Sequence, residues 1–393
     1  MCNNRYTAVV GRLSCLLVIM VLVGGADIGS PGPGNDGGLQ GVSATVQVVN
    51  MPLAGSVPDC DTDKKQNLLR YLRQLPTGDS HRMIVGQYVS VGHRSRIPGN
   101  YAEVVTRLET MTGKSPGLLE IRLFDAWPGK FAGDWALDET IKLLWDGGYM
   151  MYISLEPPNP ETGMGWHIRR DPKGKQLPAD LASVYTPGTP QNTRFNTNLN
   201  QAAGFLKKLE EKGIVVLFEP FNEQLGPWHW YAHNGAKKSA KLYRYTHDYF
   251  TKTKGLSNLL WVWEWHTAAP EGEIQDAFPG DEYVDIVGLS LYDSNPKALS
   301  AWGRLVALGK PVAFTEFGPK LQYSRNKESP PYFSWDNLIQ MEAFKAYFPE
   351  AVFFTRWHNV WATVNQNHAD EFMKDPWLID RKQLIEDRKR YCW

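Results

Sequence analysis

The sequence predicts a single (β/α)8 barrel, and three observations support that fold. Short apolar stretches rich in β-branched and aromatic residues alternate with helical patterns through most of the chain. Glycine follows several of these helical patterns, at Gly213, Gly255 and Gly309, as is common where helices end. No glycine-rich phosphate loop follows an early strand, which disfavours the alternative of a doubly wound open sheet.

Eight strands are expected because eight apolar stretches have the length and residue types of buried strands. A typical one is "GIVVLFEPFNE", in which a continuous apolar run precedes two glutamates. The predicted strands are 82–90, 117–125, 149–157, 213–223, 258–266, 284–293, 310–318 and 351–359.

Helical patterns lie between the predicted strands and before the first one. The connection between the fifth and sixth strands is the weakest, with only a short candidate at 271–277. The other predicted helices are 65–75, 101–111, 137–145, 198–212, 237–254, 297–308 and 335–347.

The first part of the chain resembles a secretory signal followed by a tether. Arg5 and Arg12 precede the apolar run "LSCLLVIMVLVGG", which is shorter than the roughly 20 residues of a membrane span. We expect residues 1–26 to be a signal peptide and 27–59, rich in Gly, Pro, Ser and Asn, to be a flexible linker. The catalytic barrel is then 60–393, in a secreted or periplasmic protein, and an uncleaved anchor is the alternative.

Two cysteines, Cys60 and Cys392, lie outside the expected signal. In an exported protein such a pair suggests one disulfide, here between the start of the folded domain and its end. That pairing requires the two ends of the domain to meet, as they do in a closed barrel. Two free thiols are the alternative.

The overall composition limits the partners of this chain. With 42 Lys+Arg and 42 Asp+Glu among 393 residues, the formal net charge is zero. There is therefore no electrostatic argument for binding nucleic acid or an anionic membrane surface. The 15 tryptophans fill the core or offer flat faces to sugar rings. We expect a monomer with no membrane span in the mature chain.

Carboxylates and aromatic residues collect at the predicted carboxyl ends of the strands, where a barrel of this type carries its active site. Their types suit a carbohydrate, because flat rings stack on sugars and acids bind hydroxyls or perform chemistry. The candidates at these ends are Asp125, Trp127, Glu156, Asn222, Glu223, Trp228, Trp230, Trp263, Glu264, His266, Tyr292, Glu316, Trp357 and His358.

Glu223 and Glu316 are the predicted catalytic pair. Cleaving a glycosidic bond needs one carboxyl group to protonate the leaving oxygen and a second to attack the sugar or activate water. These two residues follow the fourth and seventh strands, which lie on opposite walls of the barrel, so their side chains can converge. The acid should have the higher pKa and the nucleophile the lower one.

Glu219 and the histidines are expected to have supporting roles. Glu219 lies four residues before Glu223 on the same strand, which places it one layer deeper in the barrel. A buried hydrogen-bonding role is expected for it, or an ion pair with Arg122 or Arg356. His266 and His358 are expected to hydrogen-bond to other site residues. No cluster has metal-ligand spacing, so we expect neither a metal nor a cofactor.

At these residues the chain resembles the retaining (β/α)8 glycoside hydrolases, and within them it looks most like glycoside hydrolase family 26, best known for β-mannanases. The resemblance covers roughly residues 80 to 365. It rests on these segments: "FNEQLGPWHWY" around Glu223, similar to the family's His-Glu…Gly…Trp-Phe-Trp; "PPNP" at 157–160; "NLLWVW" at 258–263; "VDIVGLSLYD" with Tyr292; "FTEFG" with Glu316; and Trp357.

The resemblance implies a role for each matching residue. Glu223 would be the acid/base, Glu316 the nucleophile, and Tyr292 a hydrogen-bond donor to Glu316. Trp228 and Trp357 would stack on sugars near the cleaved bond, and Trp230 and Trp263 are further aromatic candidates. The expected reaction is hydrolysis of a β-linked polysaccharide by double displacement.

The departures from the family pattern concern the substrate more than the chemistry. Asn222 stands where the family usually has His, Glu219 where it often has Arg, and Glu156 where it often has His. Asn222 could bind the sugar 2-hydroxyl, and Glu156 could bind sugar hydroxyls directly. β-Mannan is the first expectation, and β-glucan and β-xylan stay open. A carbohydrate-binding barrel without catalysis, and a transglycosylase, are the competing functions.

Overall fold

The computed structural model describes residues 63–77, 81–89, 97–124, 131, 144–163, 165, 169–170, 176–177, 179–232, 234–320 and 335–393. The part of the chain from Gly55 to Trp393 forms one compact unit. The expected signal peptide, the linker and Cys60 lie outside the described residues.

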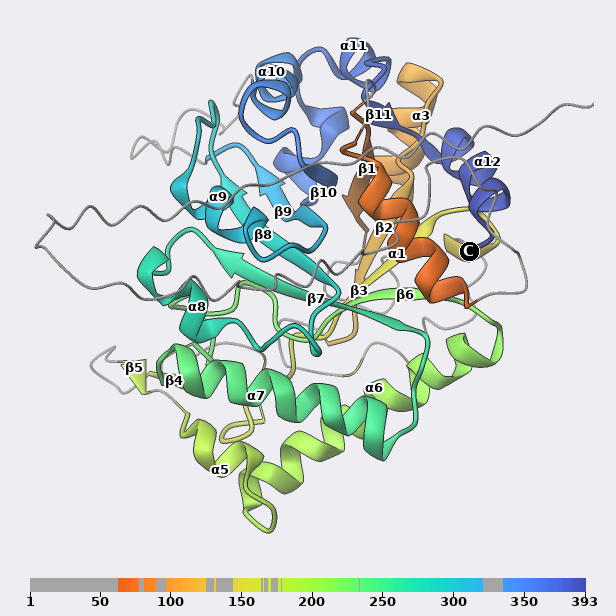
Figure 1. The fold of residues 1–393 in the computed structure, drawn as a ribbon. Coiled ribbons are helices and arrows are strands. Elements are labelled where there is room, and N and C mark those ends of the chain that lie inside the picture. Colours follow the sequence, from red (N-terminus) through yellow and green to blue (C-terminus); the bar gives the residue numbers. More distant parts are fainter. Residues whose placement is uncertain are drawn as a thin grey trace, which may run out of the picture. The chain divides into compact units, whose positions relative to one another are not determined.

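Eight parallel strands form a closed barrel (Figure 1). The barrel closes where the last of the eight strands pairs with the first, with Ile84 opposite Phe353. In barrel order the strands are β1 (Met83–Tyr88), β2 (Leu118–Arg122), β3 (Met150–Ser154), β6 (Val216–Glu219), β7 (Leu259–His266), β8 (Ile286–Tyr292), β9 (Val312–Gly318) and β10 (Ala351–Arg356). The fourth barrel strand is therefore β6, and the seventh is β9.

Within the described residues, three further short strands lie outside the ring of eight. β11 (Leu378–Ile379) pairs in parallel with the first residues of β1. β4 (Arg169–Arg170) and β5 (Gln176–Leu177) form a small antiparallel pair within the long loop after β3.

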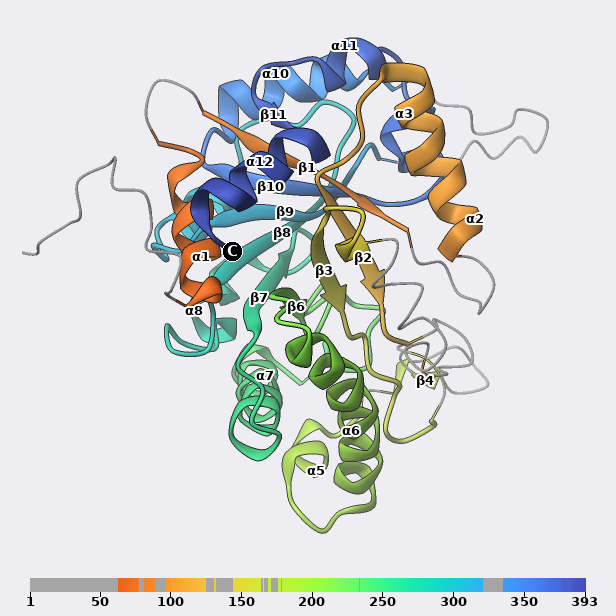
Figure 2. The same cartoon turned by 90° about the vertical axis from the view of Figure 1, so that its right-hand side faces the viewer.

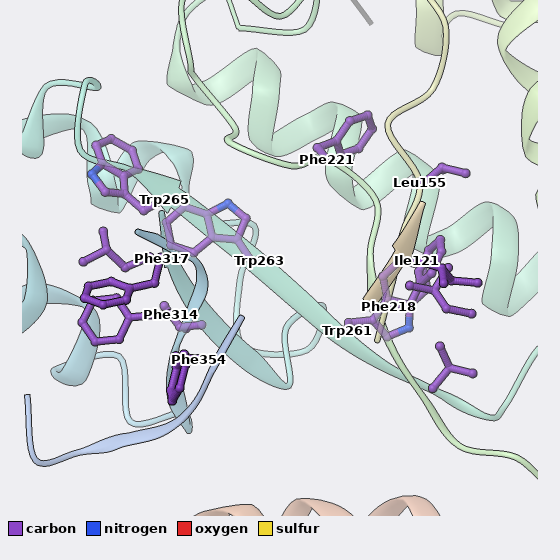
Figure 3. Close-up of a cluster of buried hydrophobic side chains, with 14 of the residues drawn as sticks. Ile121, Leu155, Phe218, Phe221, Trp261, Trp263, Trp265, Phe314, Phe317 and Phe354 are labelled. Carbon is purple, nitrogen blue, oxygen red and sulfur yellow. The ribbon is translucent and has the colours of Figure 1, made fainter. Parts of the chain in front are cut away.

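The side chains of the barrel strands alternate between two apolar layers. One layer lies between the sheet and the outer helices and contains Trp261, Trp263 and Trp265 of β7. Figure 3 shows these tryptophans in the same buried cluster as Phe314 and Phe317 of β9. The other layer includes Leu260 and Val262 of β7, which alternate with the tryptophans, together with α1 residues. Since β7 places its odd-numbered tryptophans outward, its even-numbered residues face the barrel interior.

Helices surround the barrel (Figure 2), and α6 and α7 are joined by hydrogen bonds of Tyr245 with Asn192 and Asn196. The α-helices are α1 (Lys64–Gln74), α2 (Ile97–Tyr101), α3 (Arg107–Thr112), α5 (Leu181–Tyr185), α6 (Pro190–Glu211), α7 (Ala236–Asp248), α8 (Ile274–Ala277), α9 (Ser300–Val306), α10 (Asn337–Tyr347), α11 (Ala369–Met373) and α12 (Arg381–Tyr391). Shorter helical turns are Ala102–Thr106, Tyr249–Thr253, Glu271–Glu273, Asn359–Trp361 and Thr363–Asn365.

The start points of several helices follow from local chemistry. Thr189 precedes α6, accepts a hydrogen bond from the Asn192 N–H, and is followed by Pro190 at the first helical position. Asp380 and Gln383 form a reciprocal capping box at the start of α12. These side chains satisfy backbone N–H groups that have no partner within the helix.

All eight predicted barrel strands are present, each within its expected range, and the predicted (β/α)8 fold is confirmed. The short helix expected at 271–277 is also present. None of the predicted elements corresponds to α5, α11, α12, β4, β5 or β11. Most of the helix predicted at 137–145 lies outside the described residues.

The two ends of the described barrel meet at α1 and α12. Asn67 Nδ2 of α1 donates to the carbonyl oxygen of Cys392 at 3.1 Å, and the Tyr71 hydroxyl donates to Asp387 Oδ2 at 2.8 Å. This arrangement brings Cys392 close to the first described turn of the domain. Cys60 is not among the described residues, so the Cys60–Cys392 disulfide stays a prediction.

Within the described ranges, no helix combines the length and the apolar character needed to cross a membrane.

Candidate active site

Glu316 of β9 is held by side chains from two other strands at the carboxyl end of the barrel. The Tyr292 hydroxyl, at the end of β8, donates to Glu316 Oε1 at 2.5 Å. Asn222 Nδ2, in the turn after β6, donates to Glu316 Oε2 at 3.1 Å. Both oxygens of this buried carboxyl therefore have a fixed donor, and the turn after β6 is connected directly to β9.

Glu223 follows Asn222 and is surrounded by hydrogen-bond donors. Trp228 Nε1 donates to Oε2 at 2.6 Å, and the Ser290 hydroxyl donates to Oε1 at 3.2 Å. His229 Nε2 lies 3.4 Å from Oε2, and His266 Nε2 lies 3.3 Å from Oε1. The Ala268 N–H donates to His266 Nδ1 at 2.9 Å, so neutral His266 carries its proton on Nε2 and can donate to Glu223.

The two carboxyl groups have opposite pKa shifts. Burial acts to raise the pKa of Glu223, but hydrogen bonds from His229 and His266 outweigh burial and hold that pKa well below its usual range. Burial, reinforced by the charge of Glu223, raises the pKa of Glu316 well above its usual range, although Tyr292 and Arg122 act to lower it. In the free site these shifts favour the ionised form of Glu223 and the protonated form of Glu316.

A buried ion pair lies beside the two carboxyls. Arg122, the last residue of β2, pairs with Glu156 Oε1. The Arg122 guanidinium also lies 4.7 Å from the centre of the Trp357 ring, and Trp357 stacks on Tyr88 with ring centres 4.0 Å apart. Burial raises the pKa of Glu156 to about 8, and the charge of Arg122 opposes that rise. Arg122 and Glu156 thus hold Trp357, which is only partly buried, in one orientation.

Glu156 is more enclosed than the sequence suggested. It is 1% exposed, its Oε1 pairs with Arg122, and its Oε2 is shielded from solvent. This environment fits a counter-ion for Arg122 better than a direct contact with sugar hydroxyls.

The structure corrects the expectation for two tryptophans. Trp230 is fully buried, its Nε1 donates to the Pro157 carbonyl at 2.8 Å, and its ring packs on Phe195. Trp263 is also fully buried, in the layer outside the barrel, beside Trp265 and Phe278. Neither ring offers a face to sugar in this structure, because strand alternation and loop packing direct both into the core. Trp228 and Trp357 are partly exposed.

Glu219 lies one layer below Glu223, as expected, but it pairs with neither arginine. The Tyr152 hydroxyl donates to Glu219 Oε2 at 2.7 Å, and Glu219 and Glu264 influence each other's pKa. Arg356 lies elsewhere, with its guanidinium 5.0 Å from the centre of the Phe317 ring and hydrogen-bonded to Gln340. The hydrogen-bonding alternative for Glu219 is therefore the one that the structure supports.

Several residues around the two carboxyls were given no individual role from the sequence, although Glu264 was among the candidates at the strand ends. Ser290 and His229 donate to Glu223, Trp361 packs against Tyr292, and Glu264 accepts the Glu223 N–H at 2.8 Å. A signal existed for Glu264, because it interrupts an apolar strand at a position facing the same side as Val262.

Other residues named from the sequence are outside this site or cannot be placed. His358 lies 5.1 Å from Trp357 between ring centres, and burial lowers its pKa to about 4. Asp125 and Trp127 lie outside the described residues. Across the described ranges, no three His, Cys, Asp or Glu side chains form a group that could hold a metal ion.

Comparison with known proteins identifies the family. The model of glycosyl hydrolase family 26 matches residues 57–383. A mannan endo-1,4-beta-mannosidase of Bacillus subtilis strain 168 is 27% identical over 331 residues, covering 81% of this chain and 86% of the relative. The mannan endo-1,4-beta-mannosidase A and B of Caldalkalibacillus mannanilyticus is 26% identical over 336 residues, covering 81% of this chain but only 61% of the relative.

A solved structure agrees with the sequence comparisons. The structure of a Bacillus subtilis mannanase superimposes with a TM-score of 0.68 at 25% identity, and the match covers 83% of this chain and 94% of that one. The barrel described above is thus similar in its whole course to that mannanase.

Proposed function

The chain belongs to glycosyl hydrolase family 26 and is a glycoside hydrolase, and we propose that it cleaves β-mannan with retention of configuration, using Glu223 as acid/base and Glu316 as nucleophile. The observation that carries this proposal is the connection between the two carboxyls. Asn222, the neighbour of Glu223, donates to Glu316 Oε2, so the turn that bears one carboxyl is bonded to the other. Tyr292 supports the nucleophile at 2.5 Å.

The proposed reaction has two steps. First, Glu316 attacks the anomeric carbon while Glu223 gives a proton to the glycosidic oxygen; the bond to the leaving sugar breaks and a glycosyl ester forms on Glu316. Second, Glu223 takes a proton from water, whose oxygen attacks the anomeric carbon and releases Glu316. A retaining enzyme of this kind holds its carboxyls roughly 5–5.5 Å apart.

For this mechanism to work, a proton has to move between the two carboxyls before the first step. The pKa shifts favour a proton on Glu316, whereas the first step needs it on Glu223. Substrate binding can move it, because the glycosidic oxygen is a new acceptor for a proton on Glu223. Tyr292, Asn222 and the charge of Arg122 all favour the ionised form of Glu316. The reactive form of the pair then still carries one proton, with Glu223 protonated and Glu316 ionised.

The choice of β-mannan rests on the relatives, which are named mannan endo-1,4-beta-mannosidases. We propose endo action on a β-mannan chain and secretion through the N-terminal signal sequence. β-Glucan and β-xylan are the alternatives, because Asn222, Glu219 and Glu156 depart from the family pattern near the sugar. Turnover of the purified protein on a panel of the three polysaccharides separates them, and cleavage of xylan or glucan without mannan would overturn the substrate.

The same panel tests the competing functions. A Glu316→Ala variant should lose nearly all turnover and keep measurable affinity for the glycan. A wild-type protein that binds mannan and hydrolyses no β-glycan would favour a carbohydrate-binding barrel. Longer products at high glycan concentration would indicate a transglycosylase.

A mechanism-based fluorosugar inactivator should label Glu316, because its glycosyl ester hydrolyses slowly. Peptide mass spectrometry identifies the labelled residue, and NMR of the first-formed product gives its anomeric configuration. Glu316→Ala is the control and should take up no label. Label on another residue, or inverted product, would contradict the double displacement.

A further inference from the structure

A second layer of carboxyl groups lies directly beneath the proposed acid/base. Glu219 ends β6 and Glu264 belongs to the neighbouring strand β7, and each is 1% exposed. Glu264 Oε2 accepts the backbone N–H of Glu223 at 2.8 Å. Glu219 Oε2 accepts the Tyr152 hydroxyl at 2.7 Å. One oxygen of each carboxyl therefore has a fixed donor.

The two carboxyls of this layer are placed so that one proton can join them. Glu219 and Glu264 affect each other's pKa from adjacent strands, and a hydrogen bond between them requires one of the two to be protonated, because an ionised carboxylate has no hydrogen to donate. The Oε1 atom of each is buried and has no other donor among the described residues. A proton on Glu264 completes the arrangement: Glu264 donates to Glu219 through one oxygen and accepts from Glu223 with the other.

The electrostatic environment agrees with this position of the proton. Burial raises the pKa of Glu264 well above its usual range, and the charge of Glu219 raises it further. Burial also raises the pKa of Glu219, but its hydrogen bonds from Glu264 and Tyr152 act in the opposite direction. Glu219 is thus the more readily ionised of the two, and Glu264 is the one that more readily keeps a proton.

The backbone that Glu264 contacts is in an uncommon conformation. Glu223 has a φ of 48°, in the left-handed region that residues with a side chain avoid. The turn is closed by the Gly226 N–H, which donates to the Glu223 carbonyl at 2.6 Å. Such conformations persist where the surroundings fix them, and here the fixing groups are Glu264 on the N–H and Gly226 on the carbonyl.

We propose that Glu264 is a positioning residue that holds the backbone of Glu223, and so directs its carboxyl at the glycosidic oxygen, through a proton shared with Glu219. This inference rests on the proposed role of Glu223 as acid/base. Glu264 does not touch the reacting atoms. Its effect is to fix the direction of the side chain that does.

The test compares two kinds of leaving group. Departure of a sugar from an unactivated oligosaccharide needs the acid, whereas departure of 2,4-dinitrophenolate does not. Glu264→Leu should lose about 10²-fold or more in kcat/KM on an unactivated manno-oligosaccharide, the range expected for general acid catalysis. On a 2,4-dinitrophenyl glycoside, the rate constant of the pre-steady-state burst of this variant should fall less than about tenfold.

Glu264→Gln keeps a neutral side chain with a carbonyl acceptor for the Glu223 N–H and a donor for Glu219. It should retain most activity on both substrates, within about tenfold of wild type. Glu264→Asp shortens the side chain by one methylene and should show the selective loss of Glu264→Leu. This variant keeps the test informative if the leucine variant does not fold, and the thermal midpoint of each variant reports folding.

The matched control is Glu120→Leu, which removes another carboxyl that is buried in the barrel and hydrogen-bonded to Ser154. Glu120→Leu should change the activity on the two substrates by a similar factor. Glu223→Ala should lose activity on the unactivated oligosaccharide and keep its burst on the 2,4-dinitrophenyl glycoside. If Glu223→Ala showed no such difference between the two substrates, the acid/base assignment itself would be contradicted. A folded Glu264→Leu protein that keeps its activity, or loses both activities equally while Glu223→Ala is selective, would overturn the positioning role.

Discussion

Glu223 is bonded to more donors than a general acid needs. Trp228, Ser290, His229 and His266 all approach its carboxylate, and each stabilises the charged form. His229 stays neutral near neutral pH, because burial lowers its pKa to about 4 against the opposing effect of Glu223. The environment thus favours the ionised form of Glu223, the form that it needs at the start of the second step.

The dependence of kcat/KM on pH should show how strongly these donors stabilise the Glu223 anion. Activity requires one proton on the Glu223–Glu316 pair, so the rate falls at acid pH when the pair gains a second proton and at alkaline pH when it loses the first. Replacing a donor destabilises the Glu223 anion and raises the lower of the two pKa values. His229→Phe and His266→Leu should each move the acid limb up by about 1–2 pH units, given the usual strength of a hydrogen bond to a charged group.

Groups facing Glu223 from other strands also enter this profile: Glu316, Tyr292, Arg122, Glu156, Glu219 and Glu264. They are unchanged in both histidine variants. His368→Asn, at an exposed position before α11, is the control and should leave the acid limb in place. An acid limb that stays fixed in both histidine variants would show that these side chains do not stabilise the Glu223 anion.

The ends of β8 and β9 form the element that supports the nucleophile. Gly318 ends β9, and a methyl group there would lie 2.9 Å from Tyr292 Cε1 and 2.7 Å from Trp361 Cδ1. Glycine is required because the Tyr292 and Trp361 rings pack directly on this backbone. The position of the Tyr292 hydroxyl on Glu316 therefore depends on a residue two positions after the nucleophile.

Gly318→Ala should push Tyr292 away from Glu316. We expect kcat to fall about tenfold, comparable to the loss of a hydrogen bond to a charged group, with a smaller change in KM. Tyr292→Phe should give a similar fall by removing the hydroxyl alone. Gly303→Ala is the control, because a methyl group at that position of α9 meets no atom within 4 Å. An unchanged kcat in Gly318→Ala would show that the tyrosine does not depend on this contact.

At the scale of the whole molecule, the barrel interior is unusually rich in buried carboxyl groups. Burial raises the pKa of Glu120, Glu264 and Glu316 well above the usual range and that of Glu156 to about 8. The folded protein therefore holds protons that the unfolded chain releases at neutral pH. Each such proton makes stability fall with rising pH by about 1.4 kcal/mol per unit, until the folded group itself titrates.

The free energy of unfolding should therefore decrease between pH 6.5 and 8.5. His229 and His358 have lowered pKa values and act in the opposite direction, but only between about pH 4 and 6.5. Glu223 contributes stability that is lost only below the ordinary carboxyl range. Urea unfolding at the two pH values measures the change. Glu120→Gln should reduce the slope, and Glu211→Gln, at an exposed position, should not. Stability that rises from pH 6.5 to 8.5 would contradict this account.

Most of the fold could be predicted from the sequence, because barrel strands are local apolar runs with recognisable ends. The eight strands and the short helix at 271–277 needed only composition and spacing. Glu223, Glu316, Asn222 and Tyr292 were predictable as neighbours, since a barrel brings strand ends to one face. Trp230 and Trp263 were misassigned, because being near a strand end in sequence does not determine which side a ring faces.

The sequence by itself determined a closed barrel of the glycoside hydrolase type and the strand ends that carry its polar residues. Only the tertiary structure decided the partners of each carboxyl: two histidines on Glu223, Arg122 on Glu156 rather than on Glu219, and Glu264 between Glu219 and the Glu223 backbone. The physical reason is that the two features depend on interactions over different distances along the sequence. Strand formation depends on residues close in sequence, whereas the position of a proton among buried carboxyls depends on atoms that separate strands bring within about 3 Å of one another.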